Sequence, residues 1–199
     1  MVTAQNWKDI ENEARRFLMM PDDKREALIV DICNHAQTLK TQVILCLLYL
    51  IGMRPEELLR MRKKDFQIQD QDVMILVNTV KNGNPAFPII SKNNLLMKTY
   101  ILRYIEVIPF DDAKLFQGFN DPTNFNLALS KLSKEFKLKT GVSINLSPYV
   151  FRKFRDNWLL QNGASNSDIL AWRGTKSLNV IERSYRLTAP ISKFKDLIR

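Results

Sequence analysis

The sequence predicts a mainly α-helical domain that also contains one small antiparallel β-sheet. Two observations carry this prediction. Over most of the chain, apolar residues recur at helical spacing between helix start and stop signals. Between residues 72 and 90, apolar and β-branched residues instead flank an Asn-Gly step, which is typical of a tight β-hairpin. The chain has 199 residues and is 45% hydrophobic, which is enough to bury one core.

The first half of the chain is expected to contain four helices and the hairpin. The first three helices are predicted over residues 7–19, 22–36 and 39–51, and the third is the most apolar, so we place it at the centre of the core. A fourth helix begins at Arg54-Pro-Glu-Glu57, because proline fits a first helical turn and glutamates suit its positive end. Strands are expected over residues 72–80 and 86–90, joined by the turn Lys81-Asn-Gly-Asn84, with Pro85 and Pro88 placing the second strand at a sheet edge.

The second half of the chain is expected to be helical. Helices are predicted over residues 93–107, 123–138, 148–161 and 165–172, followed by one after Gly174 that carries Tyr185. Ser147 and Pro148 have the pattern of an N-cap and a first helical residue, and Gly163 stops that helix. We expect residues 1–21 to be an N-terminal helix and linker, and residues 22–199 to form one domain.

The charge is distributed unevenly along the chain. The net charge is +9, and residues 131–199 contain 14 Lys and Arg against 5 Asp and Glu, so the whole excess lies in the C-terminal third. Such an excess is either a solvated basic surface or a face that binds a polyanion such as nucleic acid. No signal peptide or membrane span is apparent, and the longest uncharged apolar run covers only residues 43–52. We therefore expect an intracellular protein, cytoplasmic or associated with the nucleoid.

Cysteine and histidine are scarce. Cys33 and Cys46 both lie within apolar helical pattern, which favours neither a disulfide framework nor a zinc site. His35 is the single histidine, so a multi-histidine metal site is excluded. No metal or cofactor is expected.

The predicted helix over residues 148–161 has two distinct faces. Phe151, Phe154 and Trp158 share one face and are expected to pack inward, whereas the opposite face carries Tyr149, Arg152, Lys153 and Asp156. One interpretation is a solvated face with an Arg152–Asp156 ion pair. The other is that Tyr149 and Arg152, three residues apart, reach one target together.

Arg54 and Lys81 each allow a structural and a functional interpretation. Arg54 follows a buried helix and a glycine, so its guanidinium is expected to emerge from the core, where it must be paired or meet an anionic ligand. Glu57 either forms a purely structural pair with Arg54 or orients it toward a ligand. Lys81 is either an ordinary exposed lysine or a proton donor that the hairpin inserts into a DNA groove.

Together these segments resemble the tyrosine recombinase (phage integrase) family. Gly52-Met-Arg54-Pro-Glu-Glu57-Leu58, followed by Asp65-Phe66, looks like its first arginine box, and Lys81-Asn-Gly-Asn84 with Phe87-Pro88-Ile89 resembles its β-hairpin lysine motif. Pro148-Tyr149-Val-Phe-Arg152 stands where the family has a His-x-x-Arg box, residues 163–172 match the turn and helix after it, and Tyr185 falls at the nucleophile position. The resemblance runs from about Asp22 to the C-terminus. It is carried by the order and spacing of the motifs, and it implies the tyrosine recombinase catalytic-domain fold.

The sequence departs from the family pattern at three points. Tyr149 replaces the histidine of the His-x-x-Arg box; its hydroxyl can donate to a phosphate but is a poor base at neutral pH. Gly174-Thr175 aligns best with a family Gly-His step, and Arg173 and Lys176 are nearby donors that could substitute for this histidine. Residues 1–21 are too short for the helical core-binding domain that usually precedes the catalytic domain.

The resemblance implies DNA cleavage and rejoining without a metal or nucleotide cofactor. Tyr185 would attack a DNA phosphate and form a 3′-phosphotyrosine, and Lys81 would protonate the leaving 5′-oxygen. Arg54 and Arg152 would bind the non-bridging oxygens, with further hydrogen bonds from Tyr149 and from Thr175 or Lys176.

Three functions fit these residues. The favoured one is a site-specific recombinase or integrase that acts on duplex DNA as a dimer or tetramer, in which the apolar C-terminal tail docks either on a neighbouring protomer or on its own domain. The second is an integrase-fold protein that binds DNA without cutting it, as the absent histidines suggest. The third is a type IB topoisomerase-like enzyme, which would relax supercoils as a monomer.

Overall fold

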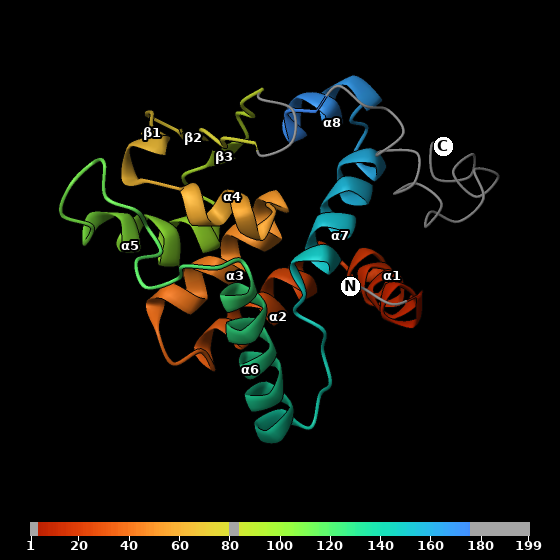
Figure 1. Cartoon of the computed structure of the whole chain (residues 1–199). Coiled ribbons are helices and arrows are strands. Elements are labelled where there is room, and N and C mark those ends of the chain that lie inside the picture. The colour runs from red at the N-terminus through yellow and green to blue at the C-terminus, as the bar shows by residue number, and fades with distance from the viewer. Residues whose placement is uncertain (1–3, 80–83, 176–199) are drawn as a thin grey trace.

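The computed structural model describes residues 4–79 and 84–175, and these form a helical body with a small sheet at one end (Figure 1). In chain order the helical elements are α1 (Ala4–Met19), α2 (Asp22–Asn34), α3 (Leu39–Ile51), α4 (Pro55–Arg60), the 3₁₀ turn η1 (Lys63–Asp65), the π-helical segment η2 (Met97–Leu102), α5 (Arg103–Glu106), α6 (Thr123–Thr140), α7 (Pro148–Gln161) and α8 (Asn166–Arg173). The strands are β1 (Phe66–Ile68), β2 (Asp72–Ile75) and β3 (Ile89–Ser91).

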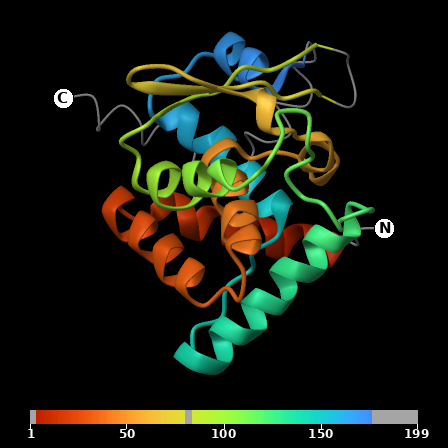
Figure 2. The same ribbon diagram turned by 90° about the vertical axis from the view of Figure 1, so that its left-hand side faces the viewer.

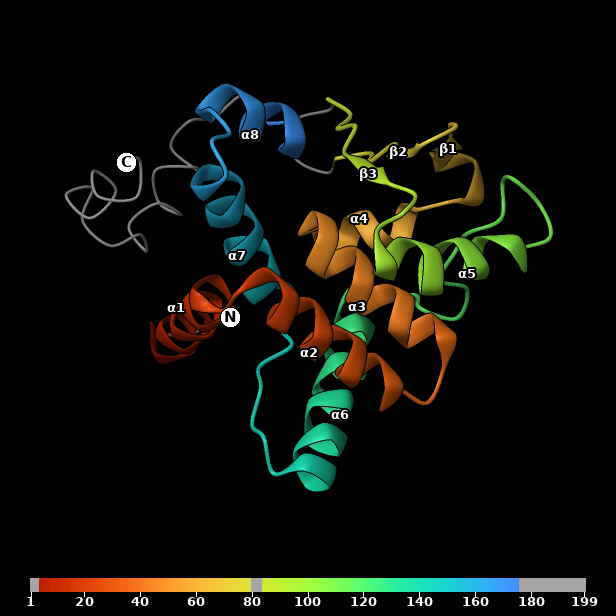
Figure 3. The same ribbon diagram turned by 180° about the vertical axis from the view of Figure 1, so that it is seen from behind.

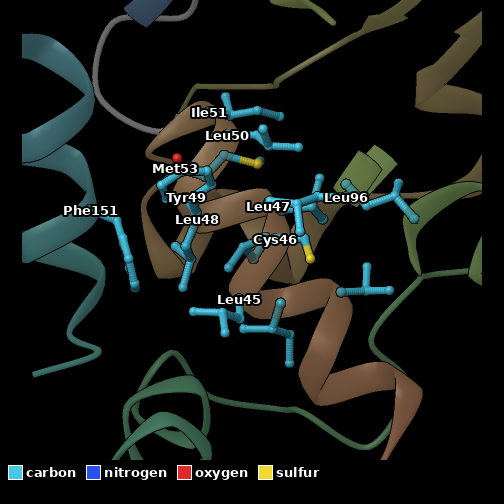
Figure 4. Packing of buried hydrophobic residues seen from close by; sticks show 14 of the residues in the cluster. Leu45, Cys46, Leu47, Leu48, Tyr49, Leu50, Ile51, Met53, Leu96 and Phe151 are labelled. Carbon is cyan, nitrogen blue, oxygen red and sulfur yellow. The ribbon is translucent and has the colours of Figure 1, made fainter. Parts of the chain in front are cut away.

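Helix α3 is the centre of the core, as its apolar sequence predicts. Every residue from Val43 to Ile51 is buried, and α3 packs against α2, η2, α5, α6 and α7. Figure 4 shows its side chains lying between Phe151 of α7 and Leu96. The view from behind shows α2 running beside α3 (Figure 3). Burial of a helix on all sides stabilises it mainly through removal of apolar surface from water.

The sheet has three antiparallel strands in the order β1-β2-β3. Phe66 of β1 pairs with Ile75 of β2, and Val73 of β2 pairs with Ile90 of β3. Beyond the strands, an isolated bridge between Val77 and Ala86 continues the β2–β3 ladder toward the turn. Figure 2 shows the sheet at the opposite end of the molecule from α6.

Helix α1 packs along α7 (Figure 1) and belongs to the same core as the rest of the described chain. Ile10, Ala14 and Phe17 of α1 are buried, and the ring of Phe17 lies 5.4 Å from that of Phe151. The helix expected within residues 1–21 is thus present and packs as a layer over α7.

The sheet and two helices differ from the sequence prediction. Strand β1 was not predicted, β2 ends at Ile75 rather than residue 80, and β3 begins at Ile89 rather than residue 86. The helix predicted over residues 93–107 is present as η2 followed directly by α5, so its first half is π-helical rather than α-helical. The helix predicted to end at Ala36 ends at Asn34. The Asn-Gly step of the hairpin and the helix predicted after Gly174 lie outside the described residues.

The polar face of α7 also differs from one interpretation of the sequence. Lys153 and Asp156 are buried, so only the start of this face, at Tyr149, is exposed to solvent. Asp156 pairs with Arg173 of α8 instead of Arg152, and Lys153 pairs with Glu11 of α1. Neighbouring helices cover the face on both sides. None of the helices in the described part of the chain is long and apolar enough to cross a membrane.

Candidate active site

Arg54 lies at the turn between α3 and α4. Gly52 ends α3 with φ of 71°, in the left-handed region, and Pro55 opens α4. The Glu57 carboxylate accepts a hydrogen bond from the Arg54 backbone N–H at 2.6 Å and from Arg54 Nη1 at 2.9 Å. The Glu57 side chain is 3% exposed and that of Arg54 is 18% exposed. The pair that the sequence suggested is present, and it holds the guanidinium at the edge of the core.

Arg152 reaches the same carboxylate from α7. Its Nη1 donates to the carbonyl oxygen of Gly52 at 3.1 Å and lies 3.9 Å from Glu57 Oε2. Burial, reinforced by the nearby charges of Arg173 and Arg54, lowers the pKa of Arg152 to about 9. The guanidinium is still protonated at neutral pH, but at a free-energy cost that an anionic ligand would relieve.

The two guanidiniums retain unused donors. Within residues 4–79 and 84–175, Arg54 and Arg152 engage their partners only through Nη1, so Nε and Nη2 of each have no partner there. Two arginines beside one buried carboxylate carry a net positive charge. Such a pair fits an oxyanion that accepts bidentate hydrogen bonds, such as a phosphodiester.

Tyr149 lies one turn before Arg152 on α7 and is 40% exposed. Its ring meets the ring of Trp7 edge-on, with centroids 6.3 Å apart. Tyr149 also lines a pocket of about 450 Å³ between α1, α6 and the segment that precedes α7. Tyr149 therefore lies on an open part of the surface, next to the helix turn that carries Arg152.

Thr175 follows the end of α8 and is buried. Its backbone N–H donates to the carbonyl oxygen of Leu170 at 3.0 Å. The preceding Gly174 has φ of 57°, and a Cβ on it would lie 2.6 Å from the Asn84 oxygen and 2.7 Å from Thr79 Cγ2. The two described ends of the β2–β3 connection therefore touch the end of α8. Lys81, Lys176 and Tyr185 lie outside the described residues.

The sequence suggests Arg173 as a donor that could replace a family histidine, but the structure places its side chain in the interior. Its guanidinium is buried against Asp156 and the backbone of Ile51, Gly52 and Arg152. Sequence pattern missed this arrangement because Asp156 has Arg152 four residues earlier on its own helix, which is the locally favoured partner. No cluster of acidic, histidine and cysteine side chains suited to a metal ion occurs in the described part of the chain.

The fold is that of solved DNA recombinases. XerA recombinase has a TM-score of 0.62 at 19% identity, covering 89% of this chain and 61% of that chain. The Tn1549 transposon integrase in complex with transposon right end DNA has a TM-score of 0.60 at 16% identity, covering 90% and 64%. The XerH site-specific recombinase, bound to palindromic difH substrate in a post-cleavage complex, has 0.58 at 14% identity, covering 98% and 51%. This chain thus spans between half and two thirds of each of those structures, and the predicted fold class is confirmed.

The family follows from the sequence match. Residues 19–189 match the model of the phage integrase family, and the chain therefore belongs to that family. This confirms the resemblance drawn from the two arginine boxes and the hairpin motif. No curated protein matches the chain.

Proposed function

We propose that this protein breaks and rejoins duplex DNA as a site-specific tyrosine recombinase. The observation that carries the proposal is the pair of guanidiniums of Arg54 and Arg152, which flank buried Glu57 and retain unused donors. Membership of the phage integrase family supports it. The excess of basic residues in the C-terminal third supports a nucleic-acid partner.

In the proposed reaction, Arg54 and Arg152 bind the two non-bridging oxygens of one DNA phosphate. Tyr185 attacks phosphorus in line and loses its proton, and Lys81 gives a proton to the leaving 5′-oxygen. The phosphotyrosyl bond keeps the energy of the broken phosphodiester, so the reverse attack by a 5′-hydroxyl rejoins the strand. Tyr149, and Thr175 or Lys176, add hydrogen bonds to the phosphate.

The working unit proposed here is an assembly of two or four copies on DNA. Strand exchange needs two duplexes to be cut in one complex, and each copy supplies one tyrosine. The solved structures of XerH and of the Tn1549 integrase contain DNA substrates, which supports duplex DNA as the partner.

The test is covalent trapping on nicked duplexes tiled across the DNA that flanks the native gene. A nick beside the scissile phosphate lets the short leaving strand diffuse away, so the phosphotyrosine adduct accumulates. Wild type should give an adduct on a denaturing gel, with the modified peptide containing Tyr185. Tyr185→Phe should bind the same duplex with nearly unchanged affinity and give no adduct.

A second candidate, DNA binding without cleavage, is favoured by one observation: Tyr149 stands where the family has a histidine. That function predicts salt-sensitive binding and no adduct on any duplex. A topoisomerase-like activity would instead relax supercoiled plasmid and yield no recombinant product. An adduct that persists in Tyr185→Phe would contradict the assigned nucleophile.

A further inference from the structure

Arg173 lies where the segments that carry Arg54 and Arg152 meet. These segments are far apart in sequence: one is the turn after α3, and the other is the second turn of α7. Arg173 is the last residue of α8, and its side chain is 5% exposed. Because the Arg173 side chain contacts both segments at once, it can hold the turn after α3 and the second turn of α7 at a fixed distance from each other.

All three nitrogens of the Arg173 guanidinium have partners. Nε donates to Asp156 Oδ1 at 2.6 Å, and Nη2 contacts the same oxygen at 2.6 Å. Nη1 donates to the carbonyl oxygens of Ile51, at 3.0 Å, and Gly52. Nη2 also donates to the carbonyl oxygen of Arg152 at 3.1 Å. Every nitrogen of this buried guanidinium is thus engaged within the protein, so Arg173 is not placed to bind a DNA phosphate.

The guanidinium fills space that a side chain at position 52 would occupy. A Cβ on Gly52 would lie 2.7 Å from Arg173 Nη2, 3.0 Å from Nη1 and 3.1 Å from the Cα of Arg152. The backbone of the turn and the backbone of α7 are thus as close as a glycine permits. Arg173 fixes this approach by hydrogen bonds to both chains.

The charge of Arg173 is balanced within the protein. Asp156 is buried and contacts both Nε and Nη2, which makes the burial of the two ions tolerable. The pair adds no net charge to the site. Its contribution is therefore geometric, whereas Arg54 and Arg152 provide the donors that point to a ligand.

We propose that Arg173 is a positioning residue that holds the Gly52 turn against α7, so that Arg54 and Arg152 can bind one phosphate together. This proposal rests on the proposed function. The next residue, Gly174, lies against Thr79 and Asn84, so the same junction also contacts the two described ends of the segment that contains Lys81.

Arg155 provides a matched control. It lies on α7, is 6% exposed, and donates through Nε and Nη2 to the carbonyl oxygen of Tyr49, at 3.0 and 2.7 Å. Burial lowers the pKa of Arg155 to about 10, much as it lowers that of Arg152. Neither of these hydrogen bonds reaches Gly52 or the Arg152 backbone. Arg155→Met should therefore remove a buried arginine of similar environment without moving the two arginines of the site.

The first measurement does not depend on DNA cleavage. Sulfate binding is followed by the rise in melting temperature with sulfate concentration, with chloride at equal ionic strength as reference. Wild type and Arg155→Met should be stabilised, and Arg152→Gln and Arg173→Met should not. If Arg173→Met does not fold, the double variant Arg173→Met/Asp156→Leu is tested instead, because it also removes the buried carboxylate that would be left without its partner. A sulfate response in the Arg173 variant equal to that of Arg155→Met would overturn the proposal.

The second measurement compares two substrates under conditions where each variant is fully folded. One nicked duplex carries the normal scissile phosphate, and the other carries a neutral methylphosphonate that needs less stabilisation of charge. Arg173→Met should slow adduct formation on the phosphate by about 100-fold, which is typical for loss of an electrostatic contact in the transition state. The loss on the methylphosphonate should be at least roughly tenfold smaller, and Arg173→Lys should be intermediate.

The outcomes separate the two proposals. Equal losses on both substrates, of the size seen with Arg155→Met, mean that Arg173 acts on stability alone. A wild-type protein whose sulfate response is lost in Arg152→Gln and Arg173→Met, but which never forms an adduct, overturns the recombinase function and keeps the positioning role. An adduct formed by Arg173→Met at the wild-type rate overturns the positioning role and keeps the function.

Discussion

Gly52→Ala tests the close approach of the two arginine segments. The backbone at position 52 has φ of 71°, where an alanine costs about 1–2 kcal/mol more than glycine. The new Cβ would also overlap Arg173 Nη2 and the Cα of Arg152, at 2.7 and 3.1 Å. The guanidinium can retreat only by giving up hydrogen bonds to buried carbonyls, at about 1–3 kcal/mol for the groups left unsatisfied. We expect a total loss of about 2–5 kcal/mol in the free energy of unfolding.

Gly141→Ala is the control for this variant. Gly141 ends α6 with φ of 75°, and no atom lies within 4 Å of the position that its Cβ would occupy. Gly141→Ala should therefore lower the free energy of unfolding by the same backbone strain, about 1–2 kcal/mol, without overlap between the new Cβ and other atoms. Urea unfolding of both variants isolates the packing contribution as the difference between them, and adduct formation should be lost only in Gly52→Ala. A difference below about 1 kcal/mol would refute the reasoning, because it would mean that the junction yields to a methyl group.

Three further predictions concern single side chains. Arg152→Met should abolish adduct formation but leave the protein as stable as wild type, or more stable, at pH 7. The gain in the free energy of unfolding should be at most about 5 kcal/mol, since each unit by which the pKa is depressed corresponds to about 1.36 kcal/mol. The pKa of Arg152 in the folded protein is depressed to about 9, so the free-energy cost of its buried charge is fully present below pH 9 and shrinks above it. The difference in melting temperature between Arg152→Met and wild type should therefore decrease as the pH rises past 9. Tyr149→Phe should slow adduct formation about tenfold through loss of one hydrogen bond, with an unchanged melting temperature because the ring contact with Trp7 remains; an unchanged rate would remove the hydroxyl from the mechanism. Cys33 and Cys46 are buried, and burial raises the pKa of the Cys46 thiol well above its usual range. A disulfide reagent should therefore modify them only as fast as the native protein opens. Rapid labelling of the folded protein would contradict this.

The helices that the sequence predicts well are those whose ends are encoded locally. Ser147 caps α7 by accepting from the Tyr149 backbone N–H, and Ser165 and Asp168 form the capping box that opens α8. Both devices involve residues within three positions of one another, so pattern alone locates them. The central position of α3 was predictable for a similar reason, since a helix that is apolar on every side must be buried.

The elements that the sequence does not predict depend on distant partners. Strand β1 is three residues long and is a strand because Phe66, Gln67 and Ile68 pair with β2. The buried polar face of α7 has the same origin. Lys153 is covered by Glu11, 142 positions earlier, and Asp156 is neutralised by Arg173, 17 positions later. Helical periodicity records which side chains share a face, but not which element covers it.

The candidate site was predictable to the extent that each motif is local. Arg54 and Glu57 are three residues apart at a helix start, and their pair forms as expected. The convergence of Arg152 on the same carboxylate is a tertiary fact that single-sequence pattern does not contain. The order of the motifs along the chain supplied it instead, through the likeness to the phage integrase family.

The charges of the described residues limit what this part of the site can do. Arg54, Arg152 and Arg173 face Glu57 and Asp156, so three positive charges are offset by two negative ones. The remaining single charge balances a phosphodiester, which carries one negative charge. The pentacoordinate transition state carries a second negative charge, and catalysis requires stronger binding of that state than of the substrate. The charge of the described residues is thus matched to the substrate. We infer that Lys81 or Lys176 supplies the additional stabilisation of the transition state. The lysine that does so would be essential for the rate of cleavage but not for DNA affinity.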